Sequence, residues 1–136
     1  NLGNPSDITP TFSMSNAEQK IVEMIDEEEK TLTTREVVEQ YFADIPIMVD
    51  IARCESRFVQ LNKDGSVHRG KLTPADVGVM QINEKYHLSQ SRKLGYDIHT
   101  IEGNLAYARY LYEKQGARPW LASSQCWAKY SEIARS

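Results

Sequence analysis

Apolar residues recur three or four positions apart in several segments of the chain, and this spacing predicts short amphipathic helices. The first two predicted helices each begin with a capping box, in which a serine or threonine precedes a glutamate by three positions. The two capping boxes are Ser15 with Glu18 and Thr33 with Glu36. The apolar stripes that follow contain Ile21, Met24 and Ile25 in the first helix and Val37, Val38, Tyr41 and Phe42 in the second.

A third helix is predicted from about residue 45 to residue 57, with Asp44 as its N-cap and Pro46 in its first turn, where a missing N–H costs nothing. Its apolar side contains Ile47, Ile51 and Phe58. Glu55 falls close to that side. A carboxylate on an apolar face is either a hydrogen-bonded structural acid or a group whose pKa is raised for acid–base chemistry.

Beyond residue 58 the pattern changes to a short alternation of apolar and polar residues around Asp64-Gly65, which predicts a hairpin or hairpin-like loop. A mostly apolar run follows from Val77 to Ile82 and is interrupted by Gly78 and Gln81. A buried glutamine needs hydrogen-bonding partners, so Gln81 is either a structural bracket or a contact to substrate.

The remainder of the chain predicts three more helices. The first is short and polar, with Asn83 as its cap and Gly95 at its end. The clearest helix runs from about residue 101 to residue 115 and ends at Gly116. After a break at residues 118–120, Ser123 or Ser124 can cap a last short helix.

These elements predict a mainly α fold, with a small β-hairpin or loop between the third helix and the Gly-Val-Met-Gln block at residues 78–81. Residues 1–14 are rich in proline, asparagine, serine and threonine and are expected to form a flexible arm. We expect an accessory helical segment at residues 15–43, the main domain at 44–130 and a tail at 131–136.

Composition narrows the function classes. A chain of 136 residues is long enough for one domain with its own core. A net charge of −3 gives no electrostatic case for a nucleic-acid partner or an anionic membrane surface. No apolar run approaches the roughly 20 residues that span a bilayer. The chain starts at Asn1 without a methionine, so an export signal or anchor could have been removed. We expect a monomer.

Cys54 and Cys126 are the two cysteines, and their separation of 72 residues is not a metal-binding spacing. They are either two buried free thiols or one disulfide that closes a long loop, which would stabilise the fold by about 3 to 4 kcal/mol. Three histidines show no ligand spacing and are expected in exposed loops; they are His68, His87 and His99. No metal and no cofactor is therefore expected.

Three blocks of sequence together carry a family resemblance. Glu55-Ser56 ends an apolar helix, residues 78–82 follow as Gly-Val-Met-Gln-Ile, and Asn104-Leu105 begins the long helix that contains Tyr110-Leu111. This order resembles the soluble lytic transglycosylase domain, a lysozyme-like fold that cleaves peptidoglycan glycan strands. The resemblance covers about residues 45 to 128. Family members usually carry an Ala-Tyr-Asn block after the long helix, whereas residues 121–126 here read Leu-Ala-Ser-Ser-Gln-Cys, so no tyrosine is assigned beside the acid.

Cys54, directly before Glu55, together with Pro119-Trp120 and Cys126-Trp127 is also similar to resuscitation-promoting factors, a related branch in which the corresponding cysteines form a disulfide. The resemblance therefore implies a Cys54–Cys126 disulfide and an oxidising compartment, such as the periplasm or the cell surface. It also implies that the partner is a peptidoglycan glycan strand.

Glu55 is the expected catalytic residue, and the resemblance implies that it works alone. It would protonate the bond between N-acetylmuramic acid and N-acetylglucosamine and then act as base while the muramic C6 hydroxyl closes a 1,6-anhydro ring. Two alternatives are a lysozyme-type hydrolase with a second carboxylate, either Asp64 or Asp76, and a glycan-binding module without activity. The expected substrate contacts are Gln81, Asp76, Tyr107, Tyr110 and Trp120, the last three by stacking on sugar rings. Ser56 is expected to hydrogen-bond locally.

Overall fold

The computed structural model describes residues 15–27 and 31–135, and these form six α-helices, one 3-10 helix and a small antiparallel sheet. In chain order the elements are α1 (Asn16–Glu27), α2 (Thr34–Tyr41), α3 (Pro46–Ser56), β1 (Asp76–Val77), β2 (Ile82–Asn83), α4 (Glu84–Lys93), α5 (Ile101–Gln115), the 3-10 helix η2 (Arg118–Ser123) and α6 (Ser124–Arg135). The predicted mainly α fold is confirmed. The predicted arm, residues 1–14, lies outside the described residues.

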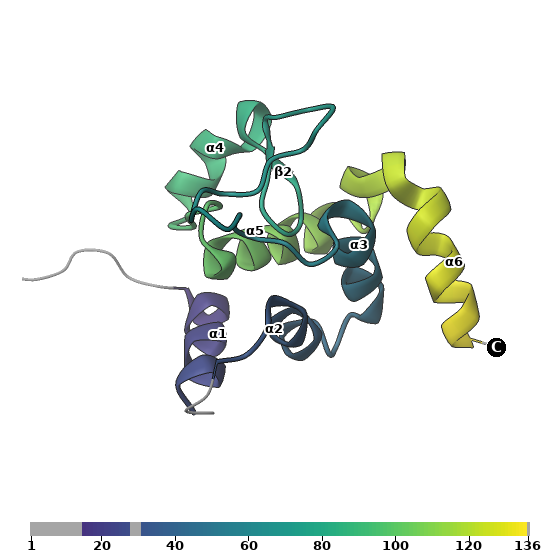
Figure 1. Cartoon of the computed structure of the whole chain (residues 1–136), viewed down its shortest axis with the longest axis horizontal. Coiled ribbons are helices and arrows are strands. Elements are labelled where there is room, and N and C mark those ends of the chain that lie inside the picture. The colour runs from purple at the N-terminus through teal and green to yellow at the C-terminus, as the bar shows by residue number, and fades with distance from the viewer. Residues whose placement is uncertain (1–14, 28–30, 136) are drawn as a thin grey trace, which may run out of the picture.

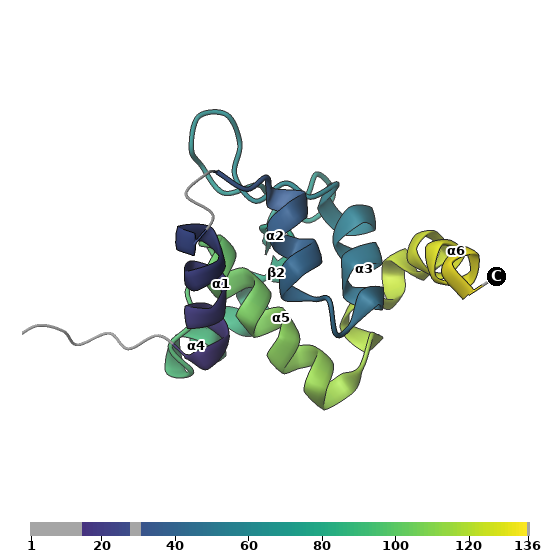
Figure 2. The same cartoon turned by 90° about the horizontal axis from the view of Figure 1, so that it is seen from below.

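Helix α5 runs through the middle of the molecule, with α1 and α2 on one side and α4 and the sheet on the other (Figure 1). Helices α2 and α3 lie side by side, and α6 packs beside α3 at one end of the molecule (Figure 2). Helix α6 continues to Arg135, through residues that we expected to form a tail. None of the helices within residues 15–27 and 31–135 is both long and apolar enough to cross a bilayer.

The starts of α1, α2 and α4 follow the sequence signals, but the start of α3 does not. Both capping boxes form: the Ser15 Oγ accepts from the Glu18 N–H at 3.1 Å, and Thr33 caps α2 in the same way. The prediction that Asp44 caps α3 is wrong, because the N-cap position is Ile45 and has no side-chain cap. Asp44 instead accepts two 2.9 Å hydrogen bonds from Arg109 of α5. A bidentate guanidinium is a stronger partner for a carboxylate than a backbone N–H.

One apolar core connects all these helices. Ile21 from α1 and Val38 from α2 belong to the same buried cluster as Met48 of α3 and Leu105 of α5. Helices α1 and α2, which lie in the predicted accessory segment, therefore pack directly on α5 and α3. Full burial of a valine, isoleucine, leucine or methionine side chain stabilises a fold by about 1.5 to 3 kcal/mol. The buried residues of α1 and α2 therefore help to hold α3 in place.

The two short strands lie on either side of the Gly-Val-Met-Gln block, pairing Asp76 with Asn83 and Val77 with Ile82. The predicted turn at residues 64–65 forms as well, with a single bridge between Leu61 and Val67. The sheet therefore presents residues 78–81 as a loop, and this loop faces the end of α3.

Candidate functional site

A cleft of about 700 Å³ opens beside the C-terminal end of α3. Its walls come from two separate stretches of the chain, residues 54–57 at the end of α3 and residues between 68 and 81. The lining residues are Cys54, Glu55, Ser56, Arg57, His68, Gly70, Lys71, Leu72, Thr73, Asp76 and Gln81. Four residues that we singled out from the sequence, Cys54, Glu55, Asp76 and Gln81, therefore meet in one cleft.

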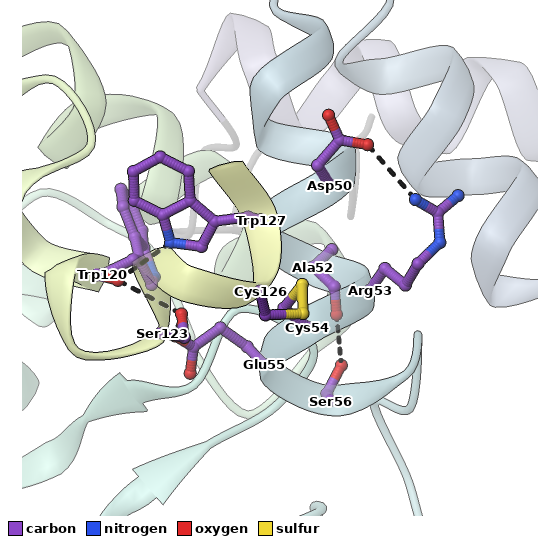
Figure 3. Close-up of a disulfide and its surroundings, with 10 residues drawn as sticks. All are labelled: Asp50, Ala52, Arg53, Cys54, Glu55, Ser56, Trp120, Ser123, Cys126 and Trp127. Carbon is purple, nitrogen blue, oxygen red and sulfur yellow. Dashed lines mark hydrogen bonds and ion pairs between the residues drawn. A yellow bond between two sulfur atoms is a disulfide. The ribbon is translucent and has the colours of Figure 1, made fainter. Parts of the chain in front are cut away.

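Glu55 lies in the last turn of α3, with its carboxyl group half-buried at the cleft. Burial raises the pKa of this carboxyl group, and a hydrogen bond from Ser123 opposes that increase. The negative charge of Asp76 raises the pKa further. The hydroxyl of Ser123 donates to Glu55 Oε2 at 2.6 Å (Figure 3). A carboxyl group with these surroundings retains a proton at a higher pH than an exposed glutamate and is suited to act as a general acid.

The loop at residues 78–81 is held against α3 and α5 by buried polar side chains. Ser56 Oγ donates to the Val79 carbonyl at 2.8 Å, and Gln60 Oε1 accepts from the Val79 N–H at 2.9 Å. Asn104 Oδ1 accepts from the Met80 N–H at 2.9 Å. The Ser56 hydroxyl also lies 3.3 Å from the Ala52 carbonyl in its own helix, which is the local contact that we expected. The three sequence blocks of the family resemblance thus meet in one hydrogen-bond network.

Gly78 is required where this loop passes over α5. Its φ is +77°, and a Cβ at this position would lie 2.3 Å from Asn104 Nδ2. That nitrogen is already engaged with the carbonyls of Val77 and Ile98 at 3.0 and 2.8 Å. Only glycine combines this backbone conformation with so close an approach.

Backbone strain in the described chain is concentrated at the cleft. Three non-glycine residues have a left-handed φ: Arg57 at 56°, Phe58 at 63° and Gln81 at 53°. Arg57 and Gln81 line the cleft. Such conformations each cost on the order of 1 to 3 kcal/mol and cluster at functional sites, where the surrounding structure maintains them.

Gln81 and Asp76 line the cleft and also have structural partners. Gln81 Nε2 donates to the Gly78 carbonyl at 2.9 Å, which closes the loop on itself. Asp76 Oδ1 accepts from Asn83 Nδ2 at 2.9 Å across the two strands. Gln81 is therefore a structural bracket that also lies within reach of a ligand.

The predicted disulfide is confirmed. Cys54 of α3 is bonded to Cys126 of α6, with their Cα atoms 6.0 Å apart. Because Cys54 directly precedes Glu55, the bond joins the C-terminal part of the chain to the helix that carries the acid (Figure 3).

The expected aromatic contacts do not lie in the cleft. Tyr107 is 1% exposed and Trp120 is 3% exposed, so neither ring can stack on a sugar, and that prediction is wrong for both. Tyr107 meets the ring of His87 through its hydroxyl group, and Trp120 Nε1 donates to the Met80 carbonyl at 2.9 Å. Tyr110 is half-buried beside Tyr107 and does not line the cleft. Trp120 therefore packs against residues 78–81, whereas Tyr107 and Tyr110 contact each other and residues of α4.

The histidines are less exposed than we expected, although His68 and His99 lie outside the helices and strands as predicted. His87 is half-buried on α4, and burial lowers its pKa. His99 is hydrogen-bonded to Glu84, which also binds Arg69. His68 is half-buried and lines the cleft. Within the described residues, no group of three histidine, cysteine, aspartate or glutamate side chains has the arrangement of a metal site.

Sequence reasoning missed Ser123, Arg57 and Lys71. Ser123 was considered only as a helix cap, yet its hydroxyl contacts Glu55. The disulfide would have identified it, because Cys126 follows Ser123 by three positions and Cys54 precedes Glu55 by one. No sequence pattern identified Arg57 or Lys71 as part of the cleft; their positive charge was the one available indication.

Comparison with known proteins gives no further identification: no family model, no curated protein and no solved structure matches this chain.

Proposed function

We propose that this protein cleaves the β-1,4 bond between N-acetylmuramic acid and N-acetylglucosamine in peptidoglycan, as a lytic transglycosylase. The observation that carries the proposal is Glu55, a half-buried carboxyl group with a raised pKa at the edge of a cleft of about 700 Å³. The second support is the convergence of Glu55-Ser56, residues 78–81 and Asn104 in one network.

In the proposed reaction Glu55 begins protonated and transfers its proton to the glycosidic oxygen as the bond from that oxygen to C1 of the muramic ring breaks. The C6 hydroxyl oxygen of the same ring then bonds to C1, and its proton moves to the Glu55 carboxylate. The products are a free 4-hydroxyl group and a 1,6-anhydro ring. No water is consumed, and Glu55 ends protonated.

The charges in the cleft support an anionic glycan as substrate. Among the described residues, no carboxylate forms an ion pair with Arg57 or with Lys71. Both side chains are exposed at the cleft that contains Glu55. Muramic acid carries a lactyl carboxylate or an attached peptide, whereas chitin oligosaccharides carry no charge. Two available cations therefore favour a muramic acid glycan over a neutral one.

Asp76 supports a second candidate, a hydrolase of lysozyme type. It lines the same cleft as Glu55, and its charge acts on the Glu55 carboxyl group. In this mechanism Asp76 would activate a water molecule, while Glu55 protonates the leaving oxygen. Asp64, the other carboxylate that we considered, lies in the exposed turn and bonds to Ser66 at 2.6 Å, so it does not line the cleft.

Digestion of purified peptidoglycan, followed by mass spectrometry of the fragments, tests the proposal. A transglycosylase releases fragments with an anhydro ring, which lack the elements of water found in hydrolytic fragments. Hydrolytic fragments from the wild type, together with loss of activity in Asp76→Asn, would establish the second candidate. Activity of Asp76→Asn that stays close to wild type, with anhydro products, supports Glu55 acting alone.

Glu55→Gln is the matched inactive variant, and we expect its activity to fall by at least about a hundredfold. Its fold should be retained, because the amide oxygen can still accept from Ser123. The wild-type carboxyl group has a raised folded-state pKa, so its contribution to stability declines as the pH rises through that pKa. Glu55→Gln should therefore be at least as stable as wild type at pH 7. Equal inactivity of both proteins, with glycan binding retained, would identify a binding module instead.

A further inference from the structure

The side chain of Ser123 is the least expected part of the cleft region. Its hydroxyl lies 2.6 Å from Glu55 Oε2 and 3.2 Å from the Trp120 carbonyl. A serine hydroxyl has one proton to donate, so the two contacts compete, and the shorter contact with the more negative acceptor is favoured. The Trp120 carbonyl is already satisfied by Trp127 Nε1 at 3.0 Å. The Ser123 proton is therefore directed at Glu55.

The two oxygens of the Glu55 carboxyl group are thereby made unequal. Oε2 accepts from Ser123, while Oε1 has no hydrogen bond to any residue in the described part of the chain. An oxygen that accepts a strong hydrogen bond is the poorer site for a proton. We infer that Ser123 is a positioning residue for Glu55, which fixes Oε2 as the acceptor and leaves Oε1 to carry the proton that is transferred to substrate. This inference rests on the proposed function.

The surroundings of Ser123 keep this contact in place. Cys126 lies one helical turn after Ser123, and its disulfide to Cys54 joins the backbone on both sides of the contact. On the other side, the Trp120 ring is buried and tied to the Met80 carbonyl at 2.9 Å. The disulfide, seen in Figure 3, and the buried hydrogen bond from Trp120 to the Met80 carbonyl thus locate a single hydroxyl group.

Removal of the hydroxyl group has a distinctive effect on pH dependence. The titratable and charged groups that line the cleft with Glu55 are Arg57, His68, Lys71 and Asp76. Ser123→Ala leaves these groups unchanged and removes the hydrogen bond that lowers the pKa of Glu55. The Glu55 pKa should therefore rise, and the alkaline limb of the kcat/KM profile should move to higher pH. The maximal rate should fall roughly tenfold, because the carboxyl group is no longer oriented.

The experiment compares Ser123→Ala with Ser123→Thr, which keeps the hydroxyl group, and with Ser124→Ala, which removes the neighbouring hydroxyl group. Each protein is titrated by carbon NMR of its labelled glutamate carboxyl groups, and the pH profile of peptidoglycan cleavage is recorded. We expect an upward pKa shift for Glu55 and the moved alkaline limb only in Ser123→Ala. Ser123→Thr should recover most of the activity, and Ser124→Ala should match wild type.

A reduced rate in Ser123→Ala with no movement of the alkaline limb or of the Glu55 titration would overturn the inference and leave Ser123 a purely structural residue. An unchanged rate and titration would overturn it as well. The NMR titration needs no substrate. It therefore decides whether Ser123 controls the Glu55 proton even if the wild-type protein fails to cleave peptidoglycan, in which case only the proposed function is lost.

Discussion

The two sides of the cleft are built in different ways. The fixed wall, which we define as residues 54–57 with Asp76 and Gln81, is held by the disulfide to α6 and by hydrogen bonds from Ser56 and Gln81 to the carbonyls of Val79 and Gly78. The loop wall, which we define as residues 68–73, is mostly exposed, and Leu72 at its edge is 98% exposed. Glu55, whose carboxyl group has a raised pKa, lies on the fixed wall.

This difference separates two requirements of a glycan-cleaving site. Acid catalysis needs the carboxyl group within a few tenths of an ångström of its working position, which calls for packed and hydrogen-bonded surroundings. Contact with a long, variable polymer needs exposed side chains that can adapt. Changes to the contacts that hold the fixed wall in place should therefore cost stability and kcat together, whereas changes to the loop wall should alter KM alone.

Removal of the disulfide should have the largest effect. In Cys54→Ala/Cys126→Ala the unfolded chain regains the freedom of a loop with a sequence separation of 72 residues, so the free energy of unfolding should fall by about 4 kcal/mol. The contact between Glu55 and Ser123 should loosen as well, because the disulfide holds both backbones. Urea denaturation measures the first effect and kcat the second. Normal kcat at a temperature where the variant is folded would show that the disulfide stabilises the fold without positioning the acid.

Gly78→Ala changes the loop that supports the fixed wall, and it should have the next largest effect on stability and kcat. The added Cβ would lie 2.3 Å from Asn104 Nδ2 and 2.8 Å from Gln60 Oε1, two atoms that hold the loop. We expect a loss of about 3 kcal/mol in the free energy of unfolding, together with reduced kcat.

Gly65→Ala is the matched control for Gly78→Ala. Gly65 also has a positive φ, +90°, but a Cβ there would meet nothing within 4 Å. The free energy of unfolding of Gly65→Ala should therefore fall by only about 1 kcal/mol, the cost of backbone strain, and kcat should be unchanged. Equal losses in the two variants would mean that φ alone, and not the close approach to α5, makes Gly78 necessary.

The sequence predicted the fixed wall better than the loop wall, for a physical reason. Capping boxes, apolar periodicity and helix ends are local signals, and they located the helix that carries Glu55 to within about one residue at each end. The Asp44 cap failed because its partner, Arg109, is 65 residues away along the chain. The Tyr107 and Trp120 predictions failed because an aromatic residue on a helix gives the same pattern whether it faces the core or a groove.

The contact between Ser123 and Glu55 depends on packing that no local pattern records. It joins the end of η2 to the end of α3, 68 residues apart. The loop wall was equally hidden, because its exposed lysine and leucine follow no periodicity. The sequence nevertheless contained the information needed to locate Ser123, once the pairing of Cys54 with Cys126 is accepted.

Lys71→Ala should have the smallest effect, and it tests the loop wall directly. Lys71 is exposed, so the free energy of unfolding should change by less than about 0.5 kcal/mol. If its ammonium group meets a carboxylate of muramic acid or of the attached peptide, KM on peptidoglycan fragments should rise about three- to fivefold at low salt, with kcat unchanged. The increase should shrink as salt screens the charges. Lys63→Ala, an exposed lysine in the turn outside the cleft, should leave KM at its wild-type value. A fall in kcat instead would show that the loop wall takes part in positioning, and the division between the two walls would be lost.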